Sequence, residues 1–173
     1  MKDVKLLNEW HPGVEIDHLT VREVLATLPG DEPTDIPWQV RMLENPASPF
    51  CLPGGSTLER HDPLHPILAH GTSKLGEMFV LGFSMGAAQA TRGWHLVLWR
   101  FWVRYINPAQ FRMGAAEIES FNRGVALAQG VGAKDIHLIP LEDRMDETVG
   151  SLRKLLGITT DRLRQEPYAH QGE

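Results

Sequence analysis

Two histidines and two acidic residues lie close together in this sequence, and their types suit a metal ion. His61, Asp62 and His65 fall within one short run, and Glu77 follows His65 after eleven intervening residues. Helical residues four apart project from nearly the same side, about 40° apart at 3.6 residues per turn. Neutral imidazole and carboxylate oxygen are ligands that zinc and similar divalent metals accept in open sites. The sequence therefore predicts a divalent-metal site built from His61, Asp62, His65 and Glu77.

A purely structural role is the alternative interpretation of these residues. His61 and His65 would then be surface histidines or hydrogen-bonded core histidines. Glu77 would only stabilise the N-terminus of a helix by its charge. The spacing alone does not decide between the two interpretations.

Pro63 limits whether His61 and His65 can lie in the same helix. The run STLE at 56–59 is a capping-box pattern that would start a helix at Ser56 and put Pro63 inside it. An interior proline costs on the order of 3 kcal/mol. The cheaper arrangement makes Asp62 the N-cap and Pro63 the first helical residue. His61 then comes from the preceding bend and still converges with His65.

Helical signals dominate the rest of the chain, in the form of capping residues, apolar positions at helical spacing, and glycine or proline stops. We expect helices over 20–28, 35–43, 64–70, 73–85, 94–106, 115–129 and 146–156, with caps at Thr20, Asp35, Thr72 or Ser73, and Asp146, and glycine stops at Gly71 and Gly157. Residues 45–55 are expected to form a loop and 135–140 a short strand without an evident partner. The predicted fold is all-α, a compact multi-helix bundle with short loops and one short extended segment.

The composition is that of one globular domain: 173 residues, of which 42% are hydrophobic and 23% charged. We expect a loosely structured segment over 1–18, a single helical domain over 19–158 and a frayed tail over 159–173. The net charge of −5 argues against non-specific nucleic-acid binding, which needs a basic surface. The single cysteine, Cys51, excludes an internal disulfide framework and a cysteine-rich zinc site.

No membrane-spanning segment is expected, because no run of about 18 apolar residues without charges occurs in the sequence. The first residues also lack the long apolar run of a signal peptide. We therefore expect a cytoplasmic protein, either free or peripheral to the inner face of a membrane.

The most apolar segment, Trp94 to Ile106, has two interpretations. Its aromatic residues with Arg100 and Arg104 suit an interfacial helix or the wall of an isoprenoid groove. The alternative is a buried core helix whose two arginines reach solvent. In the first case Arg100 and Arg104 are candidates for binding a phosphate or carboxylate head group of a substrate.

Several runs of the sequence resemble the coenzyme Q biosynthesis protein 4 family. They are ERHDPLH at 59–65 with LGE at 75–77, EDR at 142–144, and SLRKLLGI at 151–158. The resemblance covers about residues 56–158. Prolines at 63 and 66, and Met145 in place of a tryptophan, depart from the family pattern.

The resemblance implies a helical bundle that serves ubiquinone synthesis at a membrane surface. It implies that His61, Asp62, His65 and Glu77 bind a metal, with zinc the usual candidate. It also implies binding of a polyisoprenoid quinone precursor, a role in organising other enzymes of the pathway, and a link to replacing the ring carboxyl by a hydroxyl.

Two functional hypotheses follow. One is a metal-dependent oxidative decarboxylase of a prenylated aromatic acid, with Asp62 or Glu77 available for proton transfer. The other is a non-catalytic isoprenoid-binding scaffold whose metal, if any, is structural.

Small residues on the helix that contains Glu77 predict a close helix contact. Gly82 and Gly86 let another backbone approach. We expect a two-fold homodimer formed through this glycine face or through the Trp94–Ile106 helix. The alternative is a monomer whose glycines only ease packing within the chain.

Overall fold

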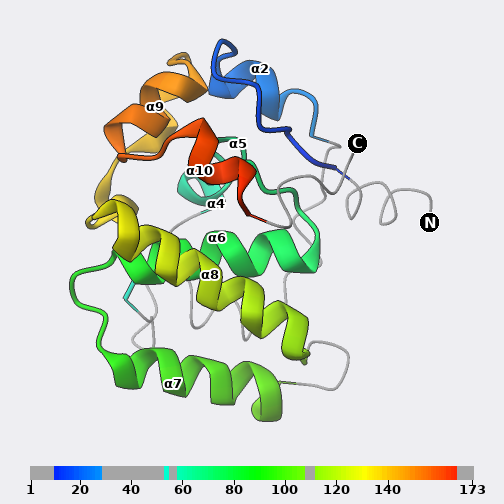
Figure 1. The fold of residues 1–173 in the computed structure, drawn as a ribbon, viewed down its shortest axis with the longest axis vertical. Helices are drawn as coiled ribbons and strands as arrows, with labels where there is room; N and C mark the ends of the chain where they lie inside the picture. The colour runs from blue at the N-terminus through cyan, green and yellow to red at the C-terminus, as the bar shows by residue number, and fades with distance from the viewer. Residues whose placement is uncertain (1–9, 29–52, 55–57, 108–111, 167–173) are drawn as a thin grey trace.

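The computed structural model describes residues 10–28, 53–54, 58–107 and 112–166. These residues form an all-α fold of packed helices, as the sequence predicts (Figure 1). The elements are α2 (Val21–Leu25), α4 (Leu58–His61), α5 (Leu64–Leu68), α6 (Lys74–Ala87), α7 (Gly93–Phe101), the π-helix η2 (Trp102–Ile106), α8 (Ala115–Val131), the 3-10 helices η4 (Ile136–Leu138) and η5 (Leu141–Arg144), α9 (Val149–Leu155) and α10 (Thr160–Arg164). Helices α6 and α8 lie side by side, with α7 at one end of the molecule and α2 and α9 at the other.

Glycines let α6 and α8 approach each other closely. A Cβ added at Gly82 would lie 2.1 Å from the carbonyl oxygen of Phe121, and one at Gly124 would lie 2.1 Å from that of Phe79. Gly86 also faces α8, because a Cβ there would lie 2.8 Å from the Cα of Val125. The glycine face is therefore occupied within the chain, as in the monomer alternative, and is not available for the predicted dimer contact.

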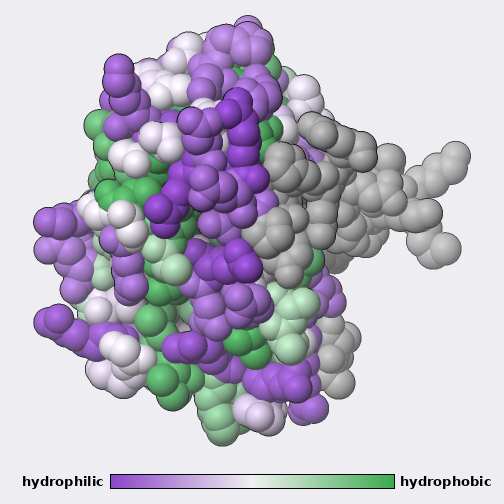
Figure 2. Space-filling view, in the orientation of Figure 1, coloured by the Kyte–Doolittle hydropathy of each residue, from purple (hydrophilic) through white to green (hydrophobic). Residues whose placement is uncertain are grey.

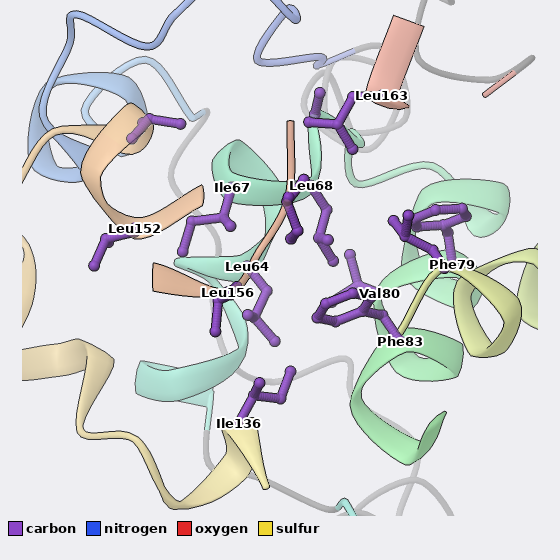
Figure 3. Close-up of a cluster of buried hydrophobic side chains, with 14 of the residues drawn as sticks. Leu64, Ile67, Leu68, Phe79, Val80, Phe83, Ile136, Leu152, Leu156 and Leu163 are labelled. Atoms are coloured by element: carbon purple, nitrogen blue, oxygen red, sulfur yellow. The ribbon is translucent and has the colours of Figure 1, made fainter. Parts of the chain in front are cut away.

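Two apolar clusters hold the helices together. The main cluster joins α2, α5, α6, α8, α9, α10, η4 and η5. Figure 3 shows part of it, with Leu64, Ile67, Leu68, Phe79, Val80, Phe83, Ile136, Leu152, Leu156 and Leu163 labelled. The second cluster lies between α6, α7 and α8, and in it the Trp99 ring stacks on Phe121 with centroids 3.9 Å apart. The second cluster is what attaches α7 to the bundle.

The prolines near the histidines lie where a helix tolerates them. Helix α4 ends at His61, and α5 starts at Leu64 with Pro63 as its N-cap. Pro66 falls in the first turn of α5, where backbone N–H groups have no partner within the helix. The chain thus breaks near the proline, as expected, but the predicted N-cap, Asp62, is one residue too early. His61 ends a helical turn rather than lying in a bend.

Several helix ends follow the predicted capping pattern. Thr20 and Glu23 form the predicted capping box of α2, and the Ser73 hydroxyl accepts the Gly76 N–H at the start of α6. The predicted helix over 35–43 and the loop at 45–52 lie outside the described residues.

Four local predictions are wrong. Residues 136–138 form a 3-10 helix rather than a strand, because no neighbouring strand is present among the described residues to pair with them. The cap of α9 is Thr148, while Asp146 pairs with Arg22. Helix α5 ends at Leu68, and its C-cap is Ala69, which lies in the left-handed region at φ 54°, rather than Gly71. The described part of the predicted frayed tail contains α10, whose Leu163 is buried.

Candidate metal centre

Three helices bring His61, His65 and Glu77 together. His61 is the last residue of α4, His65 lies in the first turn of α5, and Glu77 lies in the first turn of α6. His61 Nε2 lies 3.0 Å from Glu77 Oε2, and His65 Nε2 lies 3.4 Å from Glu77 Oε1. The two Nε2 atoms are 3.3 Å apart. One ligand atom from each residue thus lies within 4.8 Å of those of the other two, so these three residues come together as the sequence predicts.

The orientation of His65 is fixed by a backbone contact. Its Nδ1 lies 3.0 Å from the carbonyl oxygen of His70. Because a carbonyl only accepts, Nδ1 carries the hydrogen and Nε2 presents its lone pair to the cluster. Burial lowers the pKa of His65, and the nearby His61 acts in the same direction, whereas Glu77 opposes it. His65 is therefore held as a neutral imidazole, which is the ligand form.

Glu77 is held as a carboxylate. Burial raises its pKa, but the hydrogen bond with His61 opposes burial, and the pKa lies below its ordinary value. The side chains of His65, His61 and Glu77 are 3%, 16% and 38% exposed, so that the cluster is reached from the Glu77 side. The charge state and the access both suit a small cation.

The remaining predicted site residues lie elsewhere or contribute less directly. Asp62 is not part of the three-residue cluster, but its charge raises the pKa of His65. Arg100 donates to the Leu96 carbonyl and to the Asn122 side chain. Arg104 donates to the Met113 carbonyl. These hydrogen bonds of the two arginines end on residues outside the cluster, and their predicted role in substrate binding stays a prediction.

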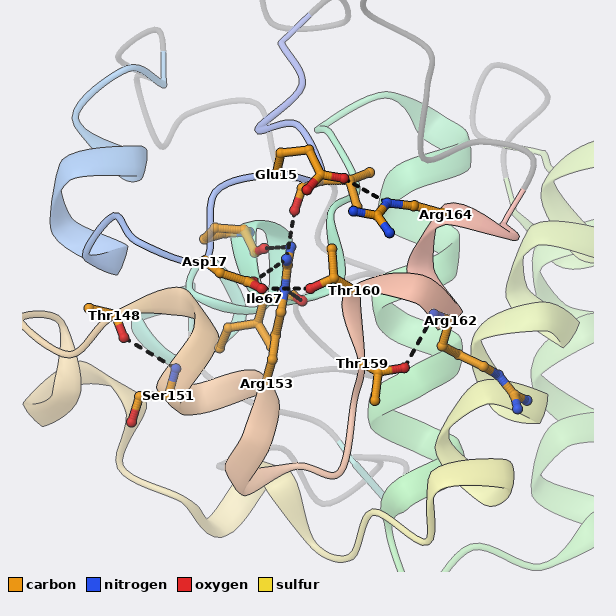
Figure 4. Close-up of polar contacts among 12 residues, drawn as sticks. Glu15, Asp17, Ile67, Thr148, Ser151, Arg153, Thr159, Thr160, Arg162 and Arg164 are labelled. Carbon is orange, nitrogen blue, oxygen red and sulfur yellow. Dashed lines mark hydrogen bonds and ion pairs between the residues drawn. The ribbon is translucent and has the colours of Figure 1, made fainter.

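Arg153 of α9 forms hydrogen bonds to the backbone of α5, and Figure 4 shows it beside Ile67 and Asp17. Its side chain is 2% exposed, and its guanidinium donates to the carbonyls of Pro66, Ile67 and Val14 and to Asp17. Two of these carbonyls come from the residues that directly follow His65. The sequence signal was an arginine on the apolar side of α9, four residues after Val149, and sequence analysis gave it no role.

An ion pair supports α4 in a similar way. Arg60 Nε lies 2.8 Å from Glu142 Oε1 of η5, and Arg60 also donates to the carbonyl of His137. Since Arg60 directly precedes His61, this pair limits the movement of His61 relative to the rest of the bundle.

The donor set fits a divalent ion. Tetrahedral zinc with bonds of about 2.0–2.1 Å requires neighbouring ligand atoms to be about 3.3–3.4 Å apart. The two histidine Nε2 atoms, 3.3 Å apart, match that value. Each of them also lies 3.0–3.4 Å from one of the two carboxylate oxygens of Glu77. The His65 lone pair and the Glu77 carboxylate are both acceptors, and a cation between them would relieve their mutual repulsion.

His70, which orients His65, gives a testable pH dependence. Its ring stacks on Phe79 with centroids 3.6 Å apart, and its Nδ1 donates to the Leu68 carbonyl. Burial lowers its pKa to about 3. The unfolded chain takes up a proton below its ordinary pKa of about 6.5, but the folded state does not, so the free energy of unfolding falls as pH falls. We expect His70 to account for a loss of about 2 kcal/mol between pH 7.5 and 5.

Urea unfolding of the metal-free protein at these two pH values measures the loss. His70→Asn keeps a donor near Leu68 but does not titrate in this range, and its loss should be smaller by about 2 kcal/mol. His18→Asn, at an exposed histidine, is the control. An unchanged pH dependence in His70→Asn would contradict the assignment.

No family model matches the chain, and no curated protein or solved structure shows significant similarity to it.

Proposed function

We propose that this protein binds a divalent metal ion, with zinc the first candidate, through His61, His65 and Glu77. The observation that supports this is the convergence of three donor atoms from three helices, with His65 held in the ligand tautomer by the His70 carbonyl. Exposure of the Glu77 side chain leaves room for a further ligand or for a substrate atom, as in open metal sites.

We further propose that the substrate is a prenylated aromatic acid of ubiquinone-type biosynthesis, or a related isoprenoid. This part rests on the resemblance of the runs at 59–65, 75–77 and 151–158 to the coenzyme Q biosynthesis protein 4 family. A bound ion would supply Lewis acidity to polarise the carboxyl group of such a ring. Glu77, or Asp62 beside the cluster, would exchange a proton with the substrate.

Metal analysis of protein purified without a histidine tag tests the first part. We expect about one zinc per chain after reloading. Mutating a residue that only hydrogen-bonds to a metal ligand weakens metal affinity by roughly 10–100-fold. Because His65 is itself a proposed ligand, we expect His65→Ala to weaken zinc affinity by more than that. His18→Ala, at an exposed histidine away from the cluster, should bind zinc like the unchanged protein. A protein that cannot be reloaded, or equal binding by His65→Ala, would refute the metal site.

The substrate part is tested separately. Mass spectrometry of lipid extracted from the purified protein should detect a bound prenyl chain. Loss of the ring carboxyl from a prenylated hydroxybenzoic acid in the presence of metal and oxygen should occur, and Glu77→Gln should abolish it. A bound prenyl lipid without turnover would favour the non-catalytic scaffold instead.

A further inference from the structure

Helix α7, with η2 that continues it, is apolar on two opposite sides. One side carries Trp99 and Val103, which are buried in the second apolar cluster. The other side points away from the bundle. Its side chains are 43–62% exposed and form the outer face of α7, defined as Trp94, Val97, Leu98, Phe101, Tyr105 and Ile106.

The outer face is continuous rather than scattered. Residues 94, 97, 98, 101 and 105 follow the helical spacing of three and four that places side chains in one stripe. Apolar side chains are visible at the end of the molecule that contains α7 (Figure 2). Single exposed apolar residues are ordinary, but a stripe of this kind marks a contact surface.

The charged side chains of the segment that contains this face all have one sign, apart from histidine. Between Glu77 and Glu117 the sequence contains four arginines and none of the chain's 22 acidic residues. The arginines are Arg92, Arg100, Arg104 and Arg112. The chain as a whole carries a net charge of −5, so this segment is basic in an otherwise acidic protein.

We propose that the outer face of α7 docks on an anionic lipid bilayer. Apolar side chains of α7 and η2 would enter the boundary between head groups and acyl chains, where tryptophan and tyrosine are favoured. The arginines would pair with lipid phosphates. None of the helices among the described residues is long and apolar enough to span a membrane, so the contact is with one surface.

A second copy of the chain fits this face less well. A two-fold contact would place the same face against itself. The four arginines of one copy would then approach those of the other, with no acidic residue in the segment to pair with them. An anionic surface supplies the opposite charge that this segment of a second copy lacks. The inference does not depend on the metal centre, since no residue of the outer face belongs to the cluster.

Vesicle flotation with the full chain tests the proposal. With phosphatidylcholine vesicles containing about a third phosphatidylglycerol, we expect at least about tenfold more bound protein than with phosphatidylcholine alone, because arginines near the surface are attracted to anionic head groups. Phe101→Glu should lower binding by about tenfold or more. Leu138→Glu, at an apolar side chain that is 66% exposed outside α7, is the matched control and should bind normally.

Zinc content is measured on the same preparations, and Phe101→Glu should keep that of the unchanged protein. Equal flotation with both vesicle types, or normal flotation of Phe101→Glu, would overturn the proposal. So would light scattering that gives twice the chain mass of 19.4 kDa for the unchanged protein and the single mass for Phe101→Glu, since a second copy would then cover this face.

Discussion

Replacing Arg153 by leucine is expected to lower the free energy of unfolding by about 3–5 kcal/mol, because removing one partner of a buried ion pair leaves the other groups without their charged partner. Leucine fills part of the volume but donates nothing. The carbonyls of Val14, Pro66 and Ile67 would lose charged donors at distances of 2.7–3.0 Å. Asp17, which is half exposed, would recover some hydration. Urea unfolding by circular dichroism measures the loss.

The same substitution should also weaken zinc binding, because Arg153 holds the carbonyls next to His65. Arg153→Lys keeps a charge and some donors and should restore part of both losses. Arg22→Leu is the matched control: Arg22 forms an ion pair with Asp146 through two hydrogen bonds, but both side chains are exposed. Its unfolding midpoint should not change measurably. If Arg153→Leu behaved like Arg22→Leu, the proposed support of α5 would be wrong.

Replacing Gly82 by alanine is expected to destabilise the fold by about 3 kcal/mol, at the upper end of overpacking costs. The added methyl group would lie 2.1 Å from the Phe121 carbonyl oxygen, and backbone cannot move away as a flexible side chain would. Helices α6 and α8 would have to separate, which also disturbs the stack of Trp99 on Phe121.

Gly93→Ala provides the control for this change. A Cβ at Gly93 meets nothing within 4 Å, and the residue begins α7. Since alanine favours a helix over glycine by up to about 1 kcal/mol, Gly93→Ala should be neutral or slightly stabilising. Thermal unfolding of the two variants gives the comparison, and a stable Gly82→Ala would show that the helices have room between them.

The sequence predicted the three donor residues because their spacing and chemistry are local. Histidines four apart, followed by a glutamate near a helix start, limit the geometry without knowledge of the rest of the fold. Caps such as Thr20 and Ser73 were predictable for the same reason, because they bond to the backbone three residues away.

Contacts between distant segments could not be predicted in this way. Arg153 reaches Pro66 across 87 positions, and no periodicity signals such a contact. Asp146 resembles a helix cap but pairs with Arg22, and Thr148 caps α9 while its backbone bridges to Thr20. The glycines of α6 were recognised as a close contact, but the sequence did not show whether the partner helix belonged to the same chain.

Residues near the two ends of the described chain contact each other, and these contacts have a consequence for the order of events during synthesis. Arg153 reaches Val14 across 139 positions, and Arg164 reaches Glu15 across 149. The three candidate ligands are all made by residue 77, yet the guanidinium that holds α5 is added only at residue 153. A growing chain therefore carries the donor atoms long before it carries their support. A contact of such large sequence separation cannot form until both segments have been made, so the candidate ligands would at first lack the support of Arg153.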